Sequence, residues 1–317
     1  MLTTFLMTLE QMIRIILLLS MGFVFNKLHI VSRTAENVLS RFTTMLFLPC
    51  LMFYSNVMEC NAASLMDNIG LVIIGTVFCL VAMGFSYPLG KVLGGEDAYQ
   101  QGVCRYALSF PNTGAFGTPL VLAFFGISGL FLFNLFNFIQ GILIYTWGII
   151  QLQSSGGKSS FGSSLKKCLN PTTIATILGL LLGILGAKEW IPDIVLKTTG
   201  DIGNCYIIVG LLLTGFTIAD YPFCRVFGNL RIWLFVLLRL IVIPGLFAAV
   251  AILCGLPLMT CILIVLTYAG PCGMNPAIYA AAYGEDCELG VGMILISSLC
   301  SVITIPVMYT LVQQFTA

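Results

Sequence analysis

The stretch Pro111-Asn112-Thr113-Gly114-Ala115-Phe116-Gly117-Thr118-Pro119 interrupts an apolar segment with prolines and glycines. A second stretch of this kind, Gly270-Pro271-Cys272-Gly273-Met274-Asn275-Pro276, interrupts another apolar segment in the second half of the chain. Within a bilayer every backbone N–H and C=O group needs a partner. Unwound backbone therefore survives there only inside protein or beside a water-filled cavity. Two such breaks in corresponding places are typical of a substrate site made from discontinuous helices.

The composition predicts an all-α polytopic membrane protein. The chain has 317 residues, of which 59% are hydrophobic and 9% charged, and its mean hydropathy is +1.03. A soluble protein of this length would carry roughly a quarter charged residues. The net charge is +1, and no basic stripe alternates with aromatic residues. We therefore expect the lipid bilayer as a partner and no nucleic acid.

Apolar runs of about twenty residues recur along the chain, and each is long enough to span a membrane. They predict ten transmembrane helices near residues 5–26, 36–56, 68–90, 99–125, 128–152, 171–187, 195–218, 231–254, 258–283 and 288–313.

The stretch 153–170 is the only extended polar linker, rich in Gly and Ser, and it divides the single transport domain 1–317 into two halves. The halves, 1–152 and 171–317, hold five predicted helices each. Because five is odd, the second half must enter the membrane from the opposite side. Residues 107–126 also align with 265–284 without gaps. We expect two inverted five-helix repeats.

The distribution of Lys and Arg predicts the orientation. With the N-terminus outside the cell, only Lys188 and Lys197 lie on the outer side, and Arg14 and Arg239 lie within spans. The inner side holds the other ten of the 14 basic residues: Lys27, Arg33, Arg41, Lys91, Arg105, Lys158, Lys166, Lys167, Arg225 and Arg231. We expect a protein of the plasma membrane with both termini extracytoplasmic and a cytoplasmic linker.

Several kinds of chemistry find no support in the chain. Twelve cysteines include no Cys-x-x-Cys pair, and most lie in apolar runs, so we expect neither a disulfide framework nor a metal site. The only histidine, His29, lies in a loop, which removes most His-based catalysis. Gly200-Asp201 resembles part of an aspartyl-protease motif but has no second intramembrane Asp. There is no P-loop, and we expect no cofactor and no enzymatic activity.

The breaks have the chemistry of an anion site. Each creates a half-helix N-terminus with partial positive charge and free N–H groups, which together can seat a carboxylate without a lysine. Asn112, Thr113 and Asn275 can add side-chain hydrogen bonds. The alternative is that the prolines merely kink packed helices. The candidate substrate-binding residues at the breaks are Pro111, Asn112, Thr113, Gly114, Pro271, Cys272, Gly273, Asn275 and Pro276.

Polar residues elsewhere in the spans give further candidates. Asn134, Asn137 and Gln140 recur every three residues, and they either line the cavity or join helices to each other. Asp201 and Asn204 are candidates for a proton or polar relay, or are simply solvated near the outer interface.

Arg239 lies well inside the eighth predicted span. It is a third relay candidate, and it can pair with a carbonyl, snorkel or neutralise an acid elsewhere. Glu10 and Arg14, four residues apart, are expected to neutralise each other.

At these residues the chain resembles the auxin efflux carrier family, which includes bacterial malate and other organic-acid permeases. The resemblance covers nearly the whole chain. It rests on Leu48–Phe53, Asn112–Leu120, Pro271–Pro276, Ala280–Asp286, Ser297-Ser298 and Ile303–Pro306.

The resemblance implies ten helices, with the fourth and ninth broken and crossing mid-membrane at the substrate site as in bile-acid transporters. It also implies a scaffold part, a moving transport part and often a homodimer. Pro49 in the second helix joins the candidate site on this basis. The seventh helix has Asn204-Cys205-Tyr206-Ile207 where many relatives carry a proline, which leaves the contribution of this helix open.

These observations predict a secondary active transporter that moves a small organic anion, such as a carboxylate or auxin-like acid, by elevator-type alternating access. An ion-coupled symporter of the bile-acid type, using sodium or protons, is one alternative. Neither break contains Asp or Glu, which disfavours tight sodium coupling. A membrane sensor on a transporter scaffold is the other alternative.

Overall fold

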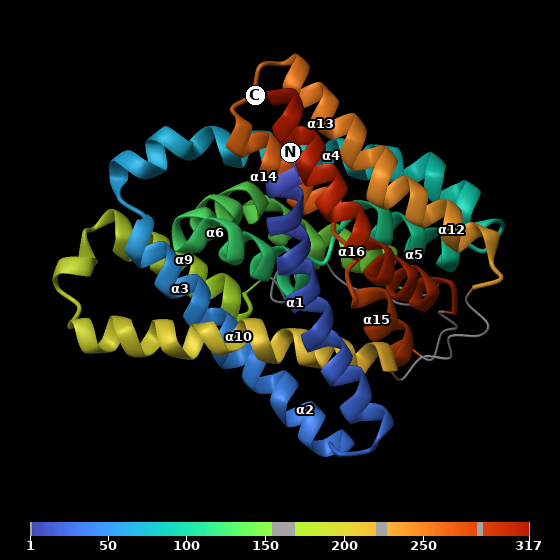
Figure 1. Ribbon diagram of the computed structural model, residues 1–317, viewed down its shortest axis with the longest axis horizontal. Helices are drawn as coiled ribbons and strands as arrows, with labels where there is room; N and C mark the ends of the chain where they lie inside the picture. Colours follow the sequence, from blue (N-terminus) through green and yellow to red (C-terminus); the bar gives the residue numbers. More distant parts are fainter. Residues whose placement is uncertain (1, 154–168, 220–226, 284–287, 317) are drawn as a thin grey trace.

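The computed structural model describes residues 2–153, 169–219, 227–283 and 288–316 (Figure 1). In these ranges all regular secondary structure is helical, apart from one isolated β-bridge between Pro111 and Cys272. Seven helical segments are long and apolar enough to cross a membrane, so the chain is an all-α polytopic membrane protein. Two further helices, Pro171–Ile184 and Leu258–Tyr268, are apolar but shorter. The expected number of ten spans stays a prediction.

Most segment boundaries lie close to those expected from hydropathy. The long helices are α1 (Leu2–Lys27), α4 (Ala62–Gly94), α6 (Thr118–Leu143), α10 (Asp193–Ala219) and α16 (Glu288–Thr316). The shorter ones are α2 (Arg33–Phe42), α3 (Leu48–Glu59), α5 (Ala98–Ser109), α7 (Ile149–Gln151), α9 (Pro171–Ile184), α12 (Leu230–Leu237), α13 (Ile243–Leu253), α14 (Leu258–Tyr268) and α15 (Asn275–Tyr283). Residues 154–168 of the predicted linker and 284–287 of the second-half motif lie outside the described residues.

Short π-helical stretches connect several of these helices, and three of them are explained by proline. They are η1 (Thr43–Phe47), η2 (Thr113–Gly117), η3 (Ile144–Gly148) and η5 (Leu238–Val242); a 3-10 turn, η4 (Ala187–Glu189), follows α9. A proline lies two residues after the end of each of these three stretches: Pro49 after η1, Pro119 after η2 and Pro244 after η5. A proline ring clashes with the carbonyl four residues earlier, and a wider π turn there accommodates it.

The first break is shorter than the sequence indicated. Only Phe110–Asn112 separate α5 from η2, and Thr113 to Pro119 are helical. The helix can begin this early because the side chain of Asn112 accepts a hydrogen bond from the backbone N–H of Ala115 at 3.1 Å. The second break covers residues 269–274, so Asn275 and Pro276 belong to the first turn of α15.

Gly126 marks the expected boundary between the fourth and fifth predicted segments. Its φ of 62° and ψ of −158° interrupt α6, whose two parts are otherwise helical. This backbone conformation is open to glycine and strongly disfavoured for residues with a Cβ.

The helices form two groups that are mixed along the sequence. The first helix group comprises α1, α2, α3, α9 and α10: α1 packs on α10, and α3 packs on α9 and α10. In Figure 1 the blue helices at the start of the chain accordingly lie against the yellow-green ones from its middle. Close approach of α1 and α10 depends on Gly22 and Gly215, where an added Cβ would strike backbone atoms of the other helix.

The second helix group comprises α4 to α7 and α12 to α16. Here α4 packs on α5 and α6, and α14 packs on α13 and α16. The two groups meet where α1 contacts α16 and where α3 contacts α6. Arg14 and Glu10 form the expected ion pair at 2.6 Å on the exposed side of α1. The predicted neutralisation of this pair is confirmed.

Candidate substrate site

The two helix breaks contact each other through their backbones. The N–H of Asn112 donates to the carbonyl of Pro271 at 2.8 Å, and the N–H of Gly273 donates to the carbonyl of Phe110 at 3.1 Å. These bonds flank the antiparallel pair of Pro111 and Cys272. A residue at such a position directs its own N–H away from the partner strand, so proline fits there without losing a bond of this pair.

Helix α16 satisfies another backbone group of the second break. The N–H of Cys272 donates to the hydroxyl oxygen of Ser297 at 3.3 Å, and both residues are fully buried. Pro271 has no N–H to satisfy. The N–H groups of Asn112, Cys272 and Gly273 thus have the internal partners that backbone needs when it is removed from water.

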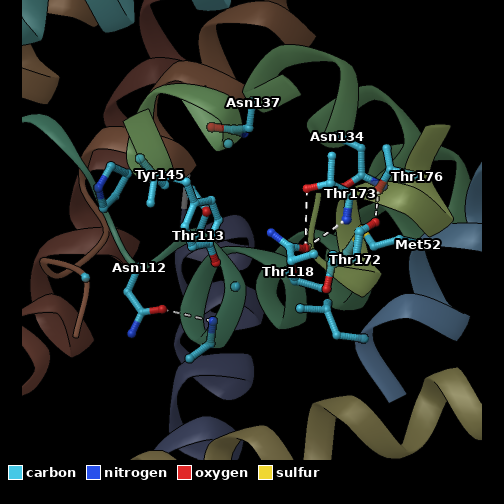
Figure 2. A pocket seen from close by; sticks show the side chains of 18 of the residues that line it. Met52, Asn112, Thr113, Thr118, Asn134, Asn137, Tyr145, Thr172, Thr173 and Thr176 are labelled. Atoms are coloured by element: carbon cyan, nitrogen blue, oxygen red, sulfur yellow. Dashed lines mark hydrogen bonds between the residues drawn. The ribbon is translucent and has the colours of Figure 1, made fainter. Parts of the chain in front are cut away.

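A cavity of about 370 Å³ lies beside the paired breaks, between the two helix groups (Figure 2). Every described residue on its wall is uncharged. The first helix group contributes Leu48, Met52, Asn170, Thr172, Thr173, Thr176 and Tyr206. The second group contributes Tyr106, Pro111, Asn112, Thr113, Gly114, Ala115, Thr118, Phe133, Asn134, Asn137, Phe138, Gly141, Ile142, Ile144, Tyr145, Gly273, Met274 and Asn275.

The start of η2 forms one polar wall of this cavity. The first N–H groups of a helix have no partner within the helix, and they carry its partial positive charge. Asn112 caps the N–H of Ala115, and the next two residues of the helix start, Thr113 and Gly114, also line the cavity. In Figure 2 Asn112 and Thr113 lie on the same side of the cavity as Tyr145. This wall can donate hydrogen bonds to an anion.

The start of α15 adjoins the same wall. The side-chain nitrogen Nδ2 of Asn275 donates to the hydroxyl oxygen of Tyr106 at 2.6 Å, and both residues line the cavity. Because this hydroxyl accepts from Asn275, its own proton is directed elsewhere. Tyr106 was not predicted from the sequence, since a tyrosine in an apolar helix gives no signal of its own.

Two amides of α6 face the cavity, as expected. Asn137 donates through Nδ2 to the hydroxyl of Thr267 on α14 at 3.2 Å, and Asn134 donates to Ser55 on α3 at 3.2 Å. These amides therefore both line the cavity and join helices, so the two interpretations are compatible. Gln140 is buried but does not line it. Six residues at 3.6 per turn place it about a third of a turn away from Asn134.

A group of threonines on α9 forms the opposite wall and was also missed. Asn170 caps α9 by accepting from the N–H of Thr173 at 3.0 Å, and Thr172, Thr173 and Thr176 reach the cavity. Figure 2 shows these threonines near Asn134, across from Asn112. The motif Asn-Pro-Thr-Thr at 170–173, which has an N-cap followed by proline at the first helical position, could have indicated this wall.

The two groups also lie close together at Gly114. A Cβ built at Gly114 would lie 3.0 Å from the hydroxyl oxygen of Tyr206 on α10. Because glycine has no Cβ, the start of η2 can approach Tyr206 of the first helix group at this position.

Some candidate residues lie away from the cavity. Four of them are buried but do not line it: Pro49, Pro271, Cys272 and Pro276. Asp201 and Asn204 are exposed on α10, whose inward face instead carries Gly203 and Tyr206. Because Asp201 and Asn204 point away from the cavity, the structure does not bring them to the other candidates.

Arg239 is fully buried behind the breaks. It donates to main-chain carbonyls at the ends of both interrupted helices, which is one of the three alternatives for this residue. It is not on the cavity wall.

Comparison with known proteins gives the family. A search of curated proteins found no match. The family model described as membrane transport protein matches residues 7–309, almost the whole chain, including both breaks and every cavity residue. Members of this family are membrane transporters. The chain belongs to the membrane transport protein family, the auxin efflux carrier family.

Proposed function

We propose that this transporter is a secondary carrier for a small organic anion, bound where the two helix breaks meet. The observation that carries the proposal is the cavity between the helix groups, onto whose wall the starts of η2 and α15 both open. Each helix start contributes about half a positive charge together with N–H donors. A carboxylate can be held by these donors although the wall has no lysine or arginine among its described residues.

The uncharged wall also bears on the size and polarity of the ligand. A volume of about 370 Å³ admits a small molecule of the usual ligand size range. Phe133, Phe138 and Met52 supply apolar surface between the two polar walls. Small carboxylates, including aromatic ones, fit this chemistry.

The position of the cavity supports alternating access as the transport mechanism. A site between two packed bodies can open to either side when one body moves against the other. We take the first helix group as the scaffold and the second, which holds both breaks, as the moving part. This division supports the elevator movement and the ten spans in two inverted repeats that the sequence predicts.

The proposed orientation places both termini outside the cell and the linker in the cytoplasm. In that orientation the cavity wall includes Asn170 and Thr172 at the cytoplasmic start of α9, which favours an inward-facing state as part of the same proposal. A homodimer formed through the scaffold belongs to the same proposal.

A two-step experiment tests the proposal. Purified protein is screened for thermal stabilisation by mono- and dicarboxylates, with matched amides and amines as controls. Stabilising compounds are then followed as radiolabelled solutes into proteoliposomes. We expect stabilisation and saturable flux for carboxylates only. Stabilisation by amines, or none by any carboxylate, would contradict the anion site.

The same vesicles separate the alternatives. Flux that requires a sodium gradient identifies the sodium-coupled symporter, and flux that follows an imposed pH gradient identifies proton coupling. Binding without any flux identifies a sensor on a transporter scaffold.

A further inference from the structure

Arg239 differs from every other charged residue in the described part of the chain, because it alone is buried. Its exposed fraction is 0%, and it lies in η5, the π-helical stretch that precedes Pro244. An ionised side chain within a membrane span is costly to bury unless it has partners. The substrate site does not supply them, since Arg239 is not on the cavity wall.

The partners of Arg239 are the two interrupted helices. Its Nη1 donates to the carbonyl of Leu108 at 2.7 Å, and its Nε makes a longer contact of 3.4 Å with the carbonyl of Gly270. Leu108 lies in the last turn of α5, and Gly270 follows the end of α14. The guanidinium carbon also lies 5.9 Å from the ring centre of Tyr268, the last residue of α14.

These contacts neutralise the partial negative charge at the C-terminal ends of two helices that stop inside the protein. The last carbonyls of each helix lack partners within the helix and carry about half a negative charge. At this crossing the C-terminal ends of α5 and α14 are both near one guanidinium, whereas the starts of η2 and α15 face the cavity. Without the cation, two ends of like charge would repel each other in a medium of low dielectric constant.

We infer that Arg239 is a positioning residue of the substrate site. Its charge holds the ends of α5 and α14 together, and thereby keeps the two breaks paired so that Asn112 and Asn275 face one cavity. This inference rests on the proposed function for its transport consequences, but the pairing of the breaks can be measured separately.

The charge-removing variant is Arg239→Met, and the charge-preserving variant is Arg239→Lys. Leu240→Ala is the matched control, because Leu240 is a fully buried neighbour in η5 that carries no charge. We expect Arg239→Met to weaken carboxylate binding by roughly tenfold or more, since small misplacements of binding groups are costly. Leu240→Ala should lower thermal stability while the folded protein keeps its affinity, and Arg239→Lys should retain most of the binding.

A cross-link measures the pairing of the breaks directly. The pair of Pro111 and Cys272 is of the non-hydrogen-bonded antiparallel kind, with Cα atoms about 4.5 Å apart, which suits a disulfide. Pro111→Cys is introduced into protein in which the exposed Cys205 and Cys254 are serine. Mild oxidation followed by mass spectrometry then gives the yield of the disulfide to Cys272.

We expect a high yield with the wild-type arginine and with Arg239→Lys, and a yield lower by severalfold with Arg239→Met. Once the disulfide has formed, Pro111→Cys protein that also carries Arg239→Met should bind carboxylates as tightly as oxidised Pro111→Cys protein with the wild-type arginine. Equal yields with the wild-type arginine and with Arg239→Met, or a loss in Arg239→Lys as large as in Arg239→Met, would overturn the inference. If Arg239→Met does not fold, Arg239→Gln, which removes the charge but keeps a hydrogen-bond donor, replaces it in the same comparison of yields with Arg239→Lys.

The two proposals fail in different ways. If wild-type protein binds no carboxylate, the proposed function fails while the cross-linking yields still report on Arg239. If carboxylates bind but the yields and the affinity do not depend on the charge at this position, the anion site stands and the role of Arg239 is purely one of packing.

Discussion

The side-chain nitrogen of Asn275 lies 2.6 Å from the hydroxyl oxygen of Tyr106, which joins the first residue of α15 to α5 at the edge of the cavity. The bond links the second helix break to the helix that precedes the first. It orients the Asn275 amide before any ligand arrives, which lowers the entropy that binding must overcome.

Tyr106→Phe removes this hydroxyl and little else. We expect carboxylate affinity to fall by a factor that corresponds to about 0.5–1.5 kcal/mol, the usual net contribution of one hydrogen bond. Isothermal titration measures it. Tyr309→Phe is the control, because the Tyr309 hydroxyl accepts from Gln313 within α16 at 2.8 Å, away from the cavity. Equal affinities of Tyr106→Phe and wild type would remove Tyr106 from the site.

Asn112 combines two roles that substitution can separate. Asn112→Ala removes both the cap of η2 and a polar cavity group, so both stability and binding should fall, stability by about 1 kcal/mol. Asn112→Asp keeps a capping oxygen but adds a negative charge beside the ligand. It should preserve thermal stability better than Ala and abolish anion binding.

Asn229→Ala controls for the cap alone. Asn229 caps α12 by accepting from the N–H of Arg231 at 3.0 Å and is not on the cavity wall. It should lower stability as Asn112→Ala does and leave affinity unchanged. Unaltered binding in both Asn112→Ala and Asn275→Ala would refute their assignment to the site.

Gly114→Ala tests the contact between the two helix groups. The added Cβ would lie 3.0 Å from the Tyr206 hydroxyl, so the groups must separate slightly or the tyrosine must shift. We expect slower transport in proteoliposomes and partial recovery in the double variant with Tyr206→Phe. Gly141→Ala is the control, since Gly141 also lines the cavity but its Cβ would meet nothing within 4 Å. A similar loss in both single variants would argue against a specific contact.

Gly126→Ala should destabilise the protein by about 1–3 kcal/mol, because the φ of 62° and ψ of −158° at this position are strained for any residue with a Cβ. Thermal unfolding in detergent measures the effect. Gly70→Ala in α4 has open space around its Cβ and should be neutral or slightly stabilising. A Gly126→Ala protein as stable as wild type would show that the turn between the two parts of α6 can relax.

Local features of the fold were predictable from the sequence because their causes are local. Proline and glycine fix where α5 and α14 stop, and hydropathy fixes most other boundaries. The extent of the first break was overestimated, since capping by Asn112 lets the helix restart at Thr113. The ion pair of Glu10 and Arg14 was predicted because the residues are one helical turn apart.

Long-range features of the site were less accessible. No local signal pairs Pro111 with Cys272 or selects the carbonyls of Leu108 and Gly270 as partners of Arg239. Asp201 was a candidate because acids are rare in spans, yet which face of α10 it occupies depends on packing against the rest of the first helix group. The threonines of α9 were overlooked because hydroxyls in membrane helices more often bond to their own backbone, as Thr176 does.

The most direct test of the central claim is an electron cryo-microscopy structure of the protein with a carboxylate taken from the stabilisation screen. We expect both helices to be interrupted, the breaks to remain paired, and density for the carboxylate within hydrogen-bonding distance of the backbone at Thr113 and Gly114 and of the Asn275 amide. A ligand bound outside this cavity, or a continuous helix through either break, would contradict the account.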